Sequence, residues 1–114
     1  MSNAESILNE DKIFAALADK NRRKILELLH AGDSTLLELN KSFPISFQAL
    51  GKHIKILENA HLLTKETQGK YRKLSLNREA LGVSMKWIAY FSDFWNQSFD
   101  KLSQQIDHNE KHDQ

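Results

Sequence analysis

The side chains best suited to binding chemistry lie in the middle third of the chain, just after its only proline, Pro44. Ser46 is placed to begin a helix whose outer face carries Gln48, Lys52 and Lys55. Amide side chains can read the edges of bases, and lysines neutralise phosphates, so this set is typical of nucleic-acid contact. A basic run can also be an ordinary solvated face. The structural elements that carry these residues must therefore decide between nucleic-acid contact and a solvated face.

The charge is unevenly distributed along the chain. The 114 residues carry a formal net charge of +1, with 16 Lys and Arg against 15 Asp and Glu. Residues 41–73 carry a net charge of +5, whereas residues 1–19 and 93–114 each carry −3. A near-neutral chain can therefore still present a basic surface to a polyanion.

Several other kinds of function find no support in the sequence. The absence of Cys excludes disulfides, thiolate metal sites and Cys nucleophiles. No glycine-rich phosphate loop, metalloprotease motif or nucleophile elbow is present, so we expect no enzyme and no cofactor. His108 and His112 could share a helical face in a polar terminal tail, where we expect no metal site. No apolar run reaches the roughly 18 residues of a membrane span, and no signal peptide is visible, so we expect a cytoplasmic protein without membrane contact.

The spacing of apolar residues predicts a mainly α fold that opens with four helices. Asp19 is expected to cap the second helix, Gly32 to end it, and Ser34 and Thr35 to form a short extended connection. Leu50, Ile54 and Leu57 form one buried stripe on the fourth helix, opposite the polar face. The four helices are expected at residues 10–18, 20–30, 36–42 and from Ser46, as the cap, to about Asn59.

A small β-hairpin is expected to follow the fourth helix. Residues 62–66 and 71–76 favour strands, and Gly69 supplies the left-handed conformation that a loop over 67–70 requires. A helix-turn-helix followed directly by a hairpin is the order of a winged helix. Lys70 and Arg72 make this wing basic, so two separate elements supply the positive charge.

The last long element is a helix from about Arg78 to Asp107. Its apolar residues recur every seven positions and, with the aromatic side chains beside them, form a stripe wider than one small domain needs to bury. The stripe could cover the core of the winged helix, but a helix–helix dimer seam accounts better for its width. The heptad positions are Leu81, Ile88, Trp95 and Leu102, with Met85, Phe99 and Ile106 on an adjacent ridge.

Three motifs together resemble the ArsR/SmtB family of bacterial winged-helix transcriptional repressors. Residues 16–29 open with A-L-A-D-x-x-R-R-x-I-L, residues 46–63 begin with S-x-x-A-L-x-K-H-I-x-x-L, and the wing contains G-K-Y-R. The resemblance covers residues 11 to 106. It implies a homodimer that pairs through its first and last helices and binds a palindromic operator in double-stranded DNA.

The resemblance and the residue types together assign roles to individual positions. Gln48 is expected to read a base and Phe47 to touch a thymine methyl group, while the cations bind phosphates. For His53, a hydrogen-bonding role in helix packing fits at least as well as a DNA contact. The expected DNA-binding residues are Lys41, Ser46, Phe47, Gln48, Lys52, His53, Lys55, Lys70 and Arg72. The expected dimer interface comprises Ile13, Phe14, Leu81, Ile88, Trp95, Phe99 and Leu102.

The chain departs from the family pattern in ways that affect sensing and affinity. Gly51 replaces a frequent serine in the recognition helix, and His61 occupies a turn position that is usually glycine. Without Cys, the thiolate sensing sites of the family are impossible, and the late aromatic pattern resembles a branch that lacks metal sites. A small-molecule effector of unknown identity could instead bind near Trp87, Tyr90 and Phe94.

The expected organisation is a tail at 1–9, a winged helix-turn-helix domain at 10–77, a dimerisation helix at 78–106 and a polar tail at 107–114. The function predicted from it is a sequence-specific transcriptional regulator that acts as a homodimeric repressor. The alternative is a winged helix that docks proteins and binds no operator. Charge separates the two, because a protein-docking version would not need cations on both the recognition helix and the wing.

Overall fold

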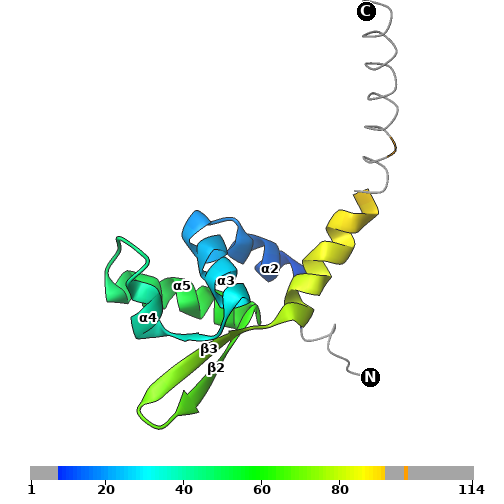
Figure 1. Cartoon of the computed structure of the whole chain (residues 1–114). Coiled ribbons are helices and arrows are strands. Elements are labelled where there is room, and N and C mark those ends of the chain that lie inside the picture. The colour runs from blue at the N-terminus through cyan, green and yellow to red at the C-terminus, as the bar shows by residue number, and fades with distance from the viewer. Residues whose placement is uncertain (1–7, 92–96, 98–114) are drawn as a thin grey trace, which may run out of the picture. The chain divides into compact units, whose positions relative to one another are not determined.

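A computed structural model describes residues 8–91 and 97 and has the element order of a winged helix (Figure 1). Its sheet is antiparallel, with strand order β1-β3-β2. Residues 78–91 are also helical. The mainly α fold with a hairpin wing is therefore confirmed. The elements are α2 (Glu10–Leu17), α3 (Lys20–Ala31), β1 (Ser34–Thr35), α4 (Leu36–Asn40), α5 (Phe47–Asn59), β2 (Leu63–Gln68) and β3 (Tyr71–Leu76).

Each helix from α2 to α5 begins at a side chain that accepts a hydrogen bond from the backbone of its first turn. Two of these caps were predicted and are confirmed. Asp19 Oδ2 accepts from the amides of Asn21 and Arg22, and Ser46 Oγ accepts from the amide of Ala49 at 3.0 Å. The caps determine where each helix begins, and the cap of α5 in particular fixes which residues form its first turn.

The core lies where α2, α3 and α5 meet the base of the hairpin. The predicted stripe of Leu50, Ile54 and Leu57 is buried, which commits the opposite face of α5 to solvent. Burying one face of an amphipathic helix stabilises it and sets which side of the helix faces solvent. The largest fully buried side chains are Ile13, Ile25, Leu50, Ile54, Leu57, Leu62, Leu63 and Leu74.

The turn between α4 and α5 is held by side chains from outside α5. Lys24 Nζ donates to the Ser42 carbonyl at 2.7 Å and lies 4.8 Å from the centre of the Phe43 ring. Asn40 Nδ2 donates to the Ile45 carbonyl at 3.2 Å. These contacts fix the path of the chain into α5, although α4 itself ends at Asn40, earlier than the predicted residue 42.

The hairpin is longer and its loop shorter than the sequence indicates. The pairing extends to Gln68 and Tyr71, so the loop is Gly69 and Lys70 alone and not residues 67–70. Gly69 has a φ of +60° at the first loop position, where a type II′ turn takes glycine. Beyond Leu63, β2 is exposed, so no hydrophobic alternation marks where the strand ends.

His61 stands in the left-handed region with a φ of 61°, in the turn that follows α5. An L-residue pays about 1–2 kcal/mol there, and glycine loses about 0.5–1 kcal/mol more backbone freedom on folding. We therefore expect His61→Gly to raise the free energy of unfolding by about 0.5 kcal/mol. The His61 carbonyl, which accepts from Asn77 Nδ2 at 2.7 Å, is kept in the variant.

Urea unfolding of wild type, His61→Gly and His61→Ala would measure this effect. The alanine variant removes the ring and keeps the Cβ atom, so its stability should not rise. An equal gain in both variants would assign the effect to the ring and contradict the backbone explanation.

The chain divides into two compact units, Met1–Ser84 and Met85–Gln114. Ala80 and Ser84 are buried within the first unit, and Leu81 packs against its core. In the second unit, the described residues include a run of exposed apolar and aromatic side chains. This run comprises Met85, Trp87, Ile88, Tyr90 and Phe91.

Candidate nucleic-acid interface

The exposed face of α5 presents the hydrogen-bonding and cationic side chains predicted for it. Gln48, Lys52 and Lys55 are exposed and, with Gly51 and Ile56, line a shallow hollow of about 490 Å³. Phe47, the first residue of α5, keeps 48% of its surface exposed. The N-terminal turn is therefore free to approach a base edge, while Ser46 is occupied as the helix cap.

A second groove, of about 300 Å³, joins the helix-turn-helix to the wing. It brings Phe47 of α5 beside Lys70 and Arg72 of the hairpin, which lie more than 20 residues later in the sequence. The groove also contains two exposed apolar side chains to which the sequence analysis assigns no role. Tyr71 stands between the two wing cations, and Leu37 of α4 is 58% exposed.

The cations of the basic segment fall into two groups. Lys65 lies 3.7 Å from a Glu58 oxygen and Lys73 lies 3.5 Å from an Asp33 oxygen, so acidic neighbours already compensate their charges. Lys41 pairs in the same way with Glu38 at 3.4 Å. Over residues 8–91, no ion pair involves the remaining four cations, which are the ones available to phosphates. They are Lys52, Lys55, Lys70 and Arg72.

His53 faces the protein more than the solvent. Its side chain is 20% exposed, and Nδ1 lies 3.2 Å from an Arg22 guanidinium nitrogen and 3.8 Å from Asp19 Oδ2. The alternative of a helix-packing role therefore describes His53 better than a DNA contact.

Asp19 stands beside this histidine at the start of α3. Hydrogen bonds from the backbone amide of Arg22 and then of Asn21, together with the nearby Arg22 guanidinium, hold the pKa of Asp19 below its usual value. A lowered folded-state pKa means that the carboxylate stabilises the fold above the unfolded-state pKa. This contribution is lost as the pH falls through the folded-state value.

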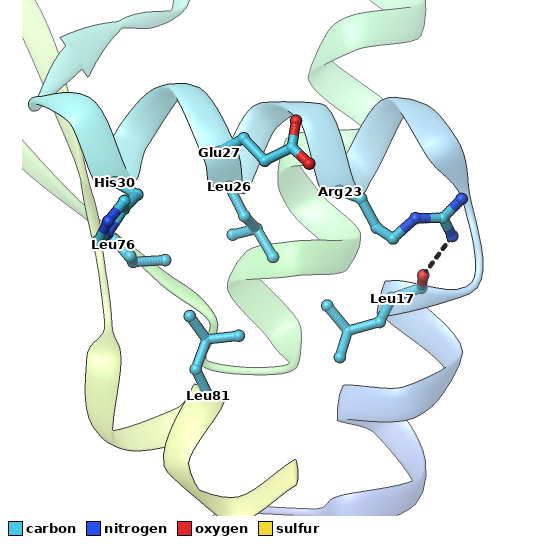
Figure 2. A pocket seen from close by; sticks show the side chains of 7 residues that line it. All are labelled: Leu17, Arg23, Leu26, Glu27, His30, Leu76 and Leu81. Carbon is cyan, nitrogen blue, oxygen red and sulfur yellow. Dashed lines mark hydrogen bonds between the residues drawn. The ribbon is translucent and has the colours of Figure 1, made fainter. Parts of the chain in front are cut away.

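A third hollow, of about 320 Å³, lies between α2, α3, the end of β3 and residue 81 (Figure 2). Leu17, Leu26, Leu76 and Leu81 give it an apolar lining, and charged or polar side chains of α3 stand along its edge. Arg23 at that edge donates a hydrogen bond to the Leu17 carbonyl at 2.7 Å. The hollow shares no residue with the two grooves described above.

The expected dimer residues have different environments in the single chain. Ile13 has no exposed surface and belongs to the core of its own chain, so its assignment to a dimer interface was wrong. Phe14 and Leu81 are half-buried, and Ile88 is 51% exposed. Trp95, Phe99 and Leu102 lie outside the described residues, as do Phe94, His108 and His112.

Two other kinds of site are absent from the described ranges. Residues 8–91 and 97 contain no group of three or more His, Asp or Glu side chains that could hold a metal ion. In the same part of the chain, no helix has both the length and the hydrophobicity needed to cross a membrane.

Known proteins share this arrangement of sequence and fold, although no protein-family model matches the chain. The transcriptional repressor SdpR of Bacillus subtilis is 35% identical over 81 residues, which cover 71% of this chain and 90% of the repressor. The arsenical resistance operon repressor of the same organism is 36% identical over 77 residues, covering 67% of this chain and 73% of that protein. A crystal structure of an ArsR family transcriptional regulator superposes with a TM-score of 0.70 at 31% identity, covering 77% of this chain and 98% of the other.

The chain belongs to the ArsR family. Its relatives are transcriptional regulators and not enzymes, which accounts for the absence of catalytic motifs. A homodimeric winged helix-turn-helix DNA-binding domain from Mycobacterium bovis shares the fold, with a TM-score of 0.62 over 85% of this chain and 93% of that domain, at 14% identity. In this ArsR-family chain, α4 and α5 form the helix-turn-helix, and β2 and β3 form the wing.

Proposed function

We propose that the protein is a homodimeric repressor that binds a palindromic operator in duplex DNA through α5 and the wing. The observation that carries this proposal is the position of the unpaired cations. Lys52 and Lys55 lie on the exposed face of α5, and the groove beside Phe47 connects that helix to Lys70 and Arg72. A winged helix that docked proteins would have no need for free cations on both elements.

In the proposed complex, the first turn of α5 enters the major groove. Gln48 reads a base edge there, with adenine as the partner that suits an amide, and Phe47 packs on a thymine methyl group. Lys52, Lys55 and the wing cations bind the flanking phosphates, which supply most of the affinity and carry no sequence information.

Two further features support the repressor and homodimer parts of the proposal. Two of its relatives in Bacillus subtilis are named as repressors. The helix at residues 85–91 exposes an aromatic cluster in which the Trp87 and Phe91 ring centres lie 4.8 Å apart and those of Tyr90 and Phe91 lie 5.0 Å apart. A second copy of the chain would bury such a face, and two-fold symmetry would make the operator a palindrome.

Selection from a random duplex library with the purified protein tests the proposal directly. We expect an enriched inverted repeat whose half-sites are spaced by about one helical turn, or about 10 base pairs, or by a multiple of it. Enrichment of a single unrepeated site would contradict the symmetric dimer. Failure to enrich any duplex at low salt would contradict operator binding itself and favour the protein-docking alternative.

A further inference from the structure

A polar cluster joins three helices behind the face of α5 that carries Gln48 and Lys52. Asp19 caps α3, Arg22 lies in the first turn of α3, and His53 projects from the middle of α5. Arg22 and His53 are both only partly exposed, so their interaction is shielded from bulk water. The cluster is a directional contact between α5 and the two helices on which it packs.

The guanidinium of Arg22 uses all three of its nitrogens. Nε donates to the Ala16 carbonyl at 2.8 Å, and Nη2 donates to the Ala15 carbonyl at 3.2 Å, both at the end of α2. Nη1 lies 3.2 Å from His53 Nδ1. Because the guanidinium is a rigid planar fork, fixing two nitrogens on α2 also fixes where the third must meet α5.

The same geometry determines the form of the imidazole. Arg22 can only donate a hydrogen bond, so a hydrogen bond across this contact needs His53 Nδ1 as its acceptor, with the ring proton on Nε2. Asp19 Oδ2 lies 3.8 Å from Nδ1, beyond hydrogen-bonding distance, and already accepts from two backbone amides. The carboxylate therefore orients the start of α3, and Arg22 makes the contact with α5.

We propose that Arg22 is a positioning residue for DNA recognition, acting through its hydrogen bond to His53. This inference rests on the proposed function of α5 as the recognition helix. The apolar contacts of Leu50, Ile54 and Leu57 are non-directional and tolerate a small rotation of α5 about its axis. The hydrogen bond at His53 does not tolerate such a rotation. It therefore holds Gln48 at a defined angle to the bases while the wing contacts the DNA backbone.

The key variant is Arg22→Lys, which keeps the charge and loses the fork. We expect affinity for the selected operator to fall about tenfold, the loss typical of one hydrogen bond to a charged group. The salt dependence of binding should stay unchanged, because no phosphate contact is removed. The matched control is Arg23→Lys, because Arg23 also donates to an α2 carbonyl, that of Leu17, and sits on the next position of α3. It should bind like wild type.

Two variants of His53 keep the test decisive even if Arg22→Lys fails to fold. His53→Leu removes the acceptor and should lose affinity to a similar extent, whereas His53→Gln offers an amide oxygen to Arg22 and should restore most of the binding. The double variant Arg22→Lys with His53→Leu should bind no worse than either single variant, since each single variant already removes the hydrogen bond between Arg22 and His53.

Nitrogen-15 NMR of the imidazole gives a readout that does not depend on DNA. At neutral pH the wild-type signal of His53 should show an unprotonated Nδ1, and Arg22→Lys should shift it. A protonated Nδ1 in the wild type would overturn the assigned hydrogen bond.

The outcomes separate this inference from the function on which it rests. If wild type selects no duplex at all, the proposed function is wrong. If wild type binds its operator and Arg22→Lys and His53→Leu bind equally tightly, only the positioning role is overturned. Equal weakening by His53→Leu and His53→Gln, with Arg22→Lys unaffected, would also overturn it, because His53 would then contact the DNA directly.

Discussion

Replacing Lys52 and Arg72 together by alanine is expected to weaken operator binding about a thousandfold near 0.15 M salt. A homodimer loses four phosphate contacts in this double variant. Each contact releases about 0.9 of a counterion and contributes a factor of about five at this salt concentration. The slope of log affinity against log salt should therefore become shallower by about 3.6.

Together, Lys52 and Arg72 test both elements of the proposed interface. Lys52 lies on α5 and Arg72 on β3, and over residues 8–91 neither takes part in an ion pair. Both side chains are exposed, so their removal should leave the fold intact. Circular dichroism and thermal unfolding of the variant would check that expectation.

The matched control is the double variant Lys65→Ala with Lys73→Ala. It removes the same net charge, here from the two strands of the hairpin, but each of these lysines already lies within 4 Å of a carboxylate. Fluorescence anisotropy between about 50 and 200 mM salt should give the control a much smaller change in slope. Equal changes in the two double variants would mean that net charge alone matters. An unchanged slope in both double variants would show that the phosphate contacts are assigned to the wrong cations.

The parts of the fold that could be predicted from the sequence are those set by local interactions. Asp19 and Ser46 each accept from amides two or three residues away, so the starts of α3 and α5 are encoded in a few neighbouring residues. The buried stripe of α5 follows the helical repeat. The hairpin was harder to delimit, because β2 is exposed along most of its length and has no buried face to impose an alternating pattern.

The candidate site was predictable in its membership and not in its pairings. Lys73 belongs to the same basic segment as Arg72, yet only the folded chain shows that Asp33, 40 positions earlier, compensates it. His53 meets an arginine 31 positions away for the same reason. Apolar spacing likewise identifies Ile13 as a buried residue without showing whether its own chain or a partner covers it, which is why its assignment was wrong.

Replacing Ile88 by glutamate is expected to convert the proposed dimer into a monomer. Ile88 is 51% exposed in the single chain, on a helix whose neighbouring side chains Met85, Trp87 and Tyr90 are also exposed. Placing a carboxylate in an apolar seam costs several kcal/mol when no cation pairs with it, and two-fold symmetry doubles the number of buried charges. Ile88→Leu keeps the apolar character and should remain dimeric. Analytical ultracentrifugation of the wild type and both variants would measure this directly.

The loss of the dimer should reduce operator affinity far more than the loss of any single DNA contact. When two half-sites are bound by linked domains, the second contact is intramolecular, and this linkage raises affinity by about 10²–10⁴. Ile88→Glu should therefore bind the full operator about as weakly as a single half-site, while its affinity for an isolated half-site equals that of one wild-type protomer, because α5 and the wing are unchanged. If Ile88→Glu remained dimeric, Ile88 would not belong to the dimer interface. A monomer that still binds the full operator as tightly as wild type would show that DNA recognition does not depend on dimerisation.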